Sequence, residues 1–138
     1  QHCTFAPLEL QRFFELTIFN FAIGNGDAHR KNFSLLTDKD GTIALSPAYD
    51  LVSSRLVIPN EKAELALTVN GKRNNLNRTD FIELADHLQF AHDYDDRKIR
   101  DLLDLRGQFT KMIGASQLNG DRRNKLEEIV SDRFDRLG

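Results

Sequence analysis

The helical hydrophobic pattern of residues 8–23 stops abruptly at Gly24, where a polar, glycine-rich run to Asn32 replaces it. Apolar side chains recur before Gly24 at the spacing of a helix with one buried face. Pro7 suits the first helical turn, where its missing N–H costs nothing, and Gly24 supplies a stop. The expected inward face consists of Leu10, Phe13, Phe14, Thr17, Ile18 and Phe21. The sequence therefore predicts a loop of fixed shape directly after a buried helix.

A β-hairpin is predicted between this loop and a second one. Phe33–Thr37 and Thr42–Leu45 have the character of two short strands. The Asp-Lys-Asp-Gly run between them is typical of a hairpin turn, because Asp-Gly tolerates positive φ. Ser46–Asp50 then forms the second loop.

The rest of the chain is predicted to be mainly helical. Thr79 is placed to cap a helix whose first turn contains Asp80, a favourable charge at the positive end of the helix dipole. A second helix is expected over Asp96–Ile113, weakened at Gly107, and a third over Asp121–Leu137.

The stretch from 55 to 78 is harder to assign. Glu64–Val69 fits either a short strand or a short helix, and a polar loop follows it. The expected fold class is α+β, mainly α-helical, as one domain over residues 1–138.

Composition excludes several classes of protein. A formal charge of −2 over 138 residues argues against bulk electrostatic affinity for nucleic acid. Uninterrupted apolar runs are too short for a membrane span, so no membrane partner is expected. Cys3 is the only cysteine, which excludes an intrachain disulfide and favours a cytoplasmic location. Because the chain begins with Gln1 and not Met, we expect a fragment of a longer protein.

Asp27, Asn32 and Asp50 have the side chains that phosphoryl transfer requires. One carboxylate orients the attacking hydroxyl and accepts its proton, while a second carboxylate and an amide oxygen hold magnesium. The predicted hairpin would bring Asn32 and Asp50 to the same end. On their own, an Asp and an Asn five residues apart are more typical of a loop aspartate that caps a turn.

A longer pattern around these residues resembles the HipA-like toxin kinases of bacterial toxin–antitoxin systems. Their catalytic loop reads much like Gly-Asn-x-Asp-x-His-x-Lys-Asn-Phe-Ser, which Gly24–Ser34 matches. Their metal loop reads much like Leu-x-Pro-x-Tyr-Asp, which Leu45–Asp50 matches in the same order and at a similar separation. The resemblance continues more loosely through Leu65–Lys72 and the helices beyond, so it covers essentially the whole chain.

The resemblance implies the C-terminal lobe of a protein-kinase-like fold, with ATP and Mg²⁺ as cofactors. It makes Asp27 the catalytic aspartate that engages a serine or threonine hydroxyl, and Asn32 and Asp50 the magnesium ligands. Lys31 is either a contact to the γ-phosphate or a solvated lysine. His29 is either a proton shuttle or a residue that bonds the loop backbone and holds Asp27. We expect Asn25 to serve the backbone geometry of the loop.

Tyr49 is expected to be a packing residue beside Asp50. The family's nucleotide-binding N-terminal part has no counterpart in these 138 residues. The chain alone is therefore expected to bind ATP weakly and to be inactive.

The partners implied by the resemblance are a helix-turn-helix antitoxin of the HipB type and a protein substrate. In this family that substrate is an aminoacyl-tRNA synthetase, whose phosphorylation stalls translation and arrests growth. DNA would be contacted only indirectly, through the antitoxin.

Two alternatives from other classes remain open. His92-Asp93, with His29, His87 and Asp27, is compatible with a metal-dependent phosphohydrolase. In that reading a transition metal would bind tightly, whereas a kinase would depend on millimolar magnesium. The chain is also compatible with a non-catalytic docking module for the antitoxin, in which case the acidic residues would not matter for docking.

Overall fold

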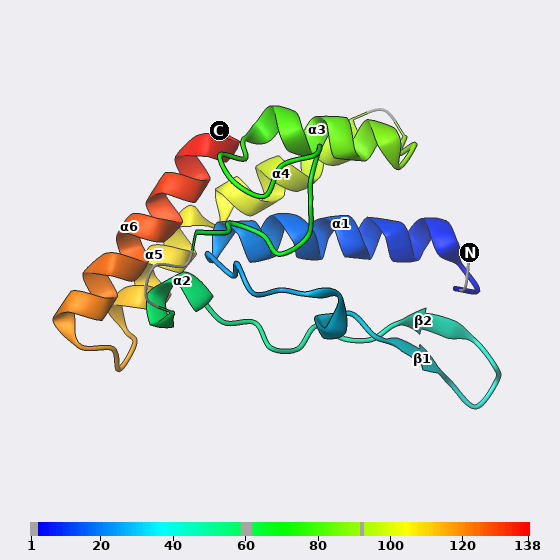
Figure 1. Ribbon diagram of the computed structural model, residues 1–138, viewed down its shortest axis with the longest axis horizontal. Coiled ribbons are helices and arrows are strands. Elements are labelled where there is room, and N and C mark those ends of the chain that lie inside the picture. The colour runs from blue at the N-terminus through cyan, green and yellow to red at the C-terminus, as the bar shows by residue number, and fades with distance from the viewer. Residues whose placement is uncertain (1–2, 59–61, 92) are drawn as a thin grey trace.

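The computed structural model describes residues 3–58, 62–91 and 93–138, which form a mainly helical domain with one small sheet (Figure 1). The predicted class, α+β and mainly α-helical, is confirmed. A short 3₁₀ turn, η1, covers Arg30–Asn32, and the sheet consists of β1 (Leu35–Thr37) and β2 (Ile43–Leu45). The α-helices are α1 (Ala6–Ala22), α2 (Ser54–Val57), α3 (Arg78–His87), α4 (Tyr94–Asp104), α5 (Arg106–Gly114) and α6 (Gly120–Leu137).

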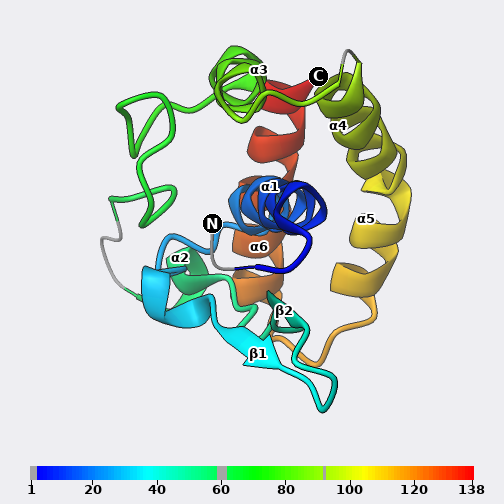
Figure 2. The same cartoon turned by 90° about the vertical axis from the view of Figure 1, so that its right-hand side faces the viewer.

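Helix α1 is the central element of the domain. It packs against α4, α6 and β2, and the view along its axis shows the other helices arranged around it (Figure 2). Phe14 and Phe21 on its inward face are completely buried. Leu10 was expected on that face, but it is 39% exposed, so this part of the prediction is wrong. The first turns of α1 approach the hairpin through Glu9, whose carboxylate accepts a hydrogen bond from the Leu45 N–H at 2.8 Å.

The predicted hairpin is present between the two loops. β1 and β2 pair antiparallel with Leu35 opposite Leu45, although each strand starts one or two residues later than expected. The Asp38 carboxylate accepts hydrogen bonds from the N–H groups of Asp40 and Thr42, which fixes the turn. Thr4 exchanges two hydrogen bonds with Ile43, and this contact ties the start of the chain to β2.

The cap of α3 differs from the prediction. Asn77, and not Thr79, is the N-cap: its side chain accepts a hydrogen bond from the Thr79 N–H, and the Asp80 carboxylate accepts one from the Asn77 N–H. This reciprocal capping box satisfies two N–H groups that would otherwise be unpaired. Thr79 therefore lies inside the first turn.

The single helix predicted over Asp96–Ile113 is two helices. The break falls at Leu105 and not at Gly107, which lies inside α5. Both helices pack on α6, and α4 packs also on α1 and α3. Phe109 of α5 contacts Phe134 of α6 edge-on, with ring centroids 5.2 Å apart.

The segment 62–77 is largely irregular, so Glu64–Val69 is neither the strand nor the helix considered above. A single bridge joins Val69 to Lys72. The segment 62–77 is anchored mainly by the buried carboxylate of Glu64, which pairs with Arg133 at 2.7 Å and with Arg136 at 2.8 Å. Both guanidinium groups also lie over the ring of Phe21, so this network joins the irregular segment, α6 and α1.

Within the described ranges, no helix is long and apolar enough to cross a membrane.

Gly24 is predicted to be far less replaceable than a glycine with similar backbone geometry. Gly24 and Gly41 both have positive φ, so alanine should cost about 1–2 kcal/mol at either position. A Cβ on Gly24 would also lie 2.6 Å from Cγ2 of Ile129, whereas nothing lies within 4 Å of the same position at Gly41. Overpacking costs a further ~1–3 kcal/mol. We expect Gly24→Ala to lower the free energy of unfolding, measured with urea, by distinctly more than Gly41→Ala. Equal losses would contradict the steric contact.

Glu64→Gln should destabilise the fold strongly because it leaves Arg133, which is nearly fully buried, without its buried counter-charge. Removing one partner of a buried ion pair costs about 3–5 kcal/mol. Asp132 contacts the same two arginines from an exposed position and provides the control, since exposed pairs contribute at most ~1 kcal/mol. Urea unfolding of Glu64→Gln and Asp132→Asn should show this contrast, and similar small losses in both would mean that the network is not important for stability.

The buried carboxylate of Glu64 should also make the stability of the fold sensitive to acid. Burial by itself raises the pKa of Glu64, but hydrogen bonds from Arg136 and the Leu76 N–H outweigh burial and lower that pKa to about 2. Because the folded pKa lies below the unfolded value of 4.5, this stabilisation is complete above about pH 5 and is lost as the pH falls towards 2. The contribution is about 3 kcal/mol. Unfolding free energies measured from pH 6 to pH 3 should fall less steeply in Glu64→Gln than in the wild type.

Candidate active site

The first loop starts at a closely packed turn. Gly24 has φ = +71° and lies against Ile129 of α6, at the end of α1. Its carbonyl accepts a hydrogen bond from the N–H of Arg55 at 3.2 Å, so the chain that returns beyond the second loop meets the first loop here. The origin of the polar loop is therefore fixed relative to the core, as its sequence predicted.

Asp27 and His29 form a pair at the surface of this loop. Nε2 of His29 lies 3.0 Å from Oδ1 of Asp27, and both side chains are more than half exposed. The backbone N–H of His29 also donates to the carbonyl of Asp27 at 2.7 Å. The imidazole thus contacts the carboxylate itself through one of its two oxygens, an arrangement that orients Asp27.

Asn32 and Asp50 meet across the base of the hairpin. Nδ2 of Asn32 donates to Oδ2 of Asp50 at 2.6 Å, although 18 residues separate them in the chain. This is the proximity that the hairpin predicted. The structure does not join them directly to Asp27: no hydrogen bond or ion pair links Asp27 to either of them among the described residues.

The Asn32–Asp50 pair fits magnesium better than a transition metal. Mg²⁺ is bound through one or two protein oxygens and keeps several waters. The Asp50 carboxylate and the Asn32 amide lie together through Nδ2 of Asn32, Oδ1 of Asn32 is the amide atom that could bind a metal, and Asp50 is exposed to solvent. In the described part of the chain, no three His, Cys, Asp or Glu side chains are grouped so that they could hold a metal ion.

Lys31 lies in the 3₁₀ turn between these two pairs. Its side chain is exposed and forms no ion pair with any described residue. The backbone carbonyl of Lys31, by contrast, accepts a hydrogen bond from the Tyr49 hydroxyl at 2.6 Å. Both readings of the lysine side chain, phosphate contact and solvated residue, remain compatible with this placement.

The alternative metal cluster is not assembled among those of its residues that the structure describes. His29 pairs with Asp27, His87 lies at the end of α3, and Asp93 precedes α4. His92 lies outside the described residues. The described members of the set therefore occupy different elements of the fold.

Sequence reasoning underestimated two residues around Asp50. Asn25, assigned only to backbone geometry, is 2% exposed and donates through Nδ2 to the carbonyl of Asp50 at 3.2 Å. Tyr49, taken as a packing residue, is 42% exposed and held through its hydroxyl. The role of Asn25 had one indication in the sequence, the polar residue Asn20 on the buried face of α1. Asn20 accepts a hydrogen bond from Asn25 at 2.8 Å.

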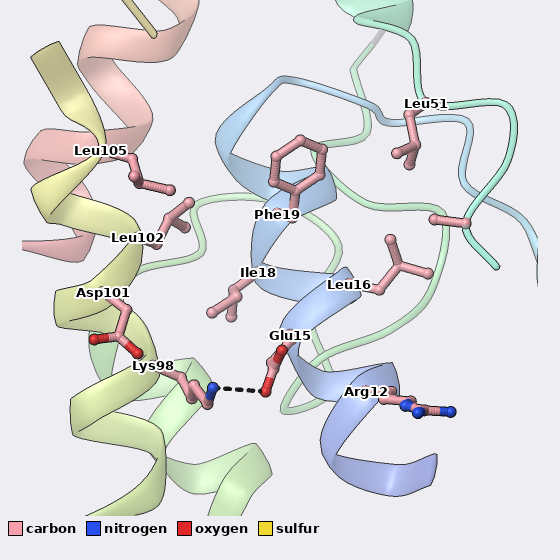
Figure 3. A pocket seen from close by; sticks show the side chains of 11 residues that line it. Arg12, Glu15, Leu16, Ile18, Phe19, Leu51, Lys98, Asp101, Leu102 and Leu105 are labelled. Atoms are coloured by element: carbon pink, nitrogen blue, oxygen red, sulfur yellow. Dashed lines mark ion pairs between the residues drawn. The ribbon is translucent and has the colours of Figure 1, made fainter. Parts of the chain in front are cut away.

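A cavity of about 450 Å³ lies beside the second loop, between α1 and α4 (Figure 3). Glu15 and Lys98 form an ion pair at 3.1 Å across one side of it. Burial and the hydrogen bond to Glu15 raise the pKa of the neighbouring Tyr94. Most of the cavity lining is hydrocarbon, from Leu16, Ile18, Phe19, Leu51, Leu102 and Leu105. None of the predicted site residues lines this cavity, so its contribution to chemistry would be indirect, through Leu51 next to Asp50.

Comparison with known proteins assigns the chain to a family. Residues 1–115 match the HipA-like C-terminal domain, and the chain belongs to this family. Two curated proteins of Sinorhizobium fredii are similar to it: "Putative kinase Y4mE", 38% identical over 72 residues, and "Putative kinase Y4dM", 38% identical over 78 residues. The matches cover 52% and 56% of this chain but only 16% and 19% of the relatives. The chain thus spans a small part of the length of the proteins it matches.

Proposed function

We propose that this chain is the catalytic lobe of an ATP- and Mg²⁺-dependent serine/threonine protein kinase. The observation that carries the proposal is the contact between Asn32 and Asp50, which lie in separate loops and supply the amide and carboxylate that a kinase uses for magnesium. Membership of the HipA-like family and the kinase names of both relatives support the same reaction class.

Each polar side chain of the two loops has a role in this proposal. Asp27 accepts the proton of the attacking serine or threonine hydroxyl while that oxygen bonds to the γ-phosphorus and ADP leaves. His29 holds the Asp27 carboxylate in place through their 3.0 Å contact. Asn32 and Asp50 would hold magnesium, which when bound neutralises phosphate charge. Lys31 would add a positive charge near the γ-phosphate.

The remaining nucleotide contacts are proposed to lie on sequence outside these 138 residues, in the same protein or in a partner subunit. The relatives are several times longer than the matched region. Six large apolar side chains are exposed on the hairpin, the second loop and α2, along the side of α1 that carries both loops (Figure 1). They are Leu35, Leu36, Leu51, Val52, Val57 and Ile58. Burying such a surface is favourable by ~25 cal/mol per Å², so it suits the packing of a further subdomain.

The biological setting proposed is a toxin–antitoxin system in the cytoplasm. The partner would be a helix-turn-helix antitoxin of the HipB type, and the substrate a protein linked to translation, such as an aminoacyl-tRNA synthetase. Family membership supports this setting.

The test of the function is substitution of Asp27 in the full-length protein. Asp27→Asn should lower kcat by about 10²–10⁴, since it removes the general base. The melting temperature should not change, because the side chain is about half exposed. Transfer from radiolabelled ATP to protein, at millimolar Mg²⁺, is the measurement.

Asp40→Asn is the matched control, because it removes the same charge at the exposed hairpin turn. It should leave transfer unchanged. Full activity of Asp27→Asn would show that the catalytic assignment is wrong. Activity that needs a tightly held transition metal, and not millimolar magnesium, would favour the phosphohydrolase.

A further inference from the structure

Asp50 is held in an unusual backbone conformation. Its φ of +56° lies in the left-handed region, which costs most residues about 1–2 kcal/mol, although aspartate tolerates it better than most. The side chains of residues 47–52 are exposed, so hydrophobic packing does little to impose this conformation. Hydrogen bonds from neighbouring residues must therefore maintain it.

One of these hydrogen bonds comes from beneath the loop. Nδ2 of Asn25 donates to the carbonyl of Asp50 at 3.2 Å and to Oδ1 of Asn20 at 2.8 Å. Asn20 in turn donates through its own Nδ2 to the Leu16 carbonyl at 2.8 Å, so its amide oxygen must face Asn25. This chain of buried amides connects the backbone of the central helix to the backbone of Asp50 and fixes the orientation of both side chains.

A second anchor comes from the side of the loop. The Tyr49 hydroxyl lies 2.6 Å from the carbonyl of Lys31 and 2.7 Å from Oγ of Ser34. A carbonyl only accepts, so the tyrosine proton points to Lys31 and the Ser34 hydroxyl donates to the tyrosine oxygen. The residue before Asp50 is thereby bonded to the residue before Asn32.

We propose that Asn25 and Tyr49 are positioning residues that set the Asp50 carboxylate against Asn32 and so determine the metal affinity of the site. This inference rests on the proposed function. Asn25 restrains the backbone of Asp50 from the core, and Tyr49 keeps the two loops in register at their exposed edge. Neither residue is proposed as a metal ligand or as a catalytic group.

Tyr49→Phe is the decisive variant, since it deletes one exposed hydroxyl and leaves the ring. The probe is Mn²⁺ alone, added to the full-length protein without nucleotide, with free Mn²⁺ measured by electron paramagnetic resonance. A lost hydrogen bond of ordinary strength predicts a Kd raised about three- to tenfold. The melting temperature without metal should stay near that of the wild type. In the transfer assay, excess Mg²⁺ should restore the activity of this variant.

Tyr94→Phe is the matched control. Tyr94 is the other tyrosine of the chain, and its hydroxyl also makes a 2.6 Å hydrogen bond, to Glu15 of α1, which belongs to neither loop. The same deletion there should leave the Mn²⁺ affinity unchanged. Asn25→Ala should weaken Mn²⁺ binding at least as much as Tyr49→Phe. If Asn25→Ala does not fold, Tyr49→Phe alone decides.

Two further variants separate this inference from the proposed function. Asn32→Ala and Asp50→Ala should abolish Mn²⁺ binding at this site. If they do so while Tyr49→Phe binds Mn²⁺ as the wild type does, the metal site stands and the positioning role is overturned. If Asn32→Ala and Asp50→Ala bind Mn²⁺ unchanged, the proposed metal site itself is wrong.

Discussion

The close approach of Gly24 to Ile129 determines where the chain leaves its central helix, and the candidate site is built outward from that point. Only a residue without a side chain fits against α6 with this backbone geometry. The Gly24 carbonyl also binds the N–H of Arg55, so the chain returning from the second loop is fixed to the same turn. This one turn therefore fixes both the start of the first loop and the chain that follows the second loop.

Polar side chains in this domain divide into buried supports and exposed residues of the candidate site. Asn20, Asn25 and Glu64 are buried, and each is compensated by hydrogen bonds or by paired charge. Burying a polar group without a partner costs several kcal/mol, so these groups are stable only in one arrangement. Asp27 and Asp50 are exposed, where a substrate or an ion can reach them. Rigidity thus comes from beneath the site, and reactivity is left at its surface.

The sequence predicted the elements with strong local signals. The apolar stripe of α1 and the Asp-Gly turn located the central helix and the hairpin, and the hairpin in turn predicted that Asn32 would meet Asp50. The missed features depend on contacts between distant parts of the chain. Leu105 interrupts a helical pattern that continues on both sides of it, and no local signal marks that position. Asn77, and not Thr79, is the N-cap of α3. Both residue types are good caps, and the capping box with Asp80 selects Asn77.

The same distinction applies within the site. Asp27, Asn32 and Asp50 were proposed because the longer pattern around them resembles that of a kinase family, whereas Asn25 and Tyr49 form hydrogen bonds to backbone carbonyls. A carbonyl is present at every position, so the sequence alone does not indicate which one a side chain will bind. The loop that carries Asp50 is attached to the core mainly by such bonds, since Leu51 and Val52 beside it are exposed. A subdomain that packed on these two apolar side chains would therefore act directly on the loop that carries Asp50.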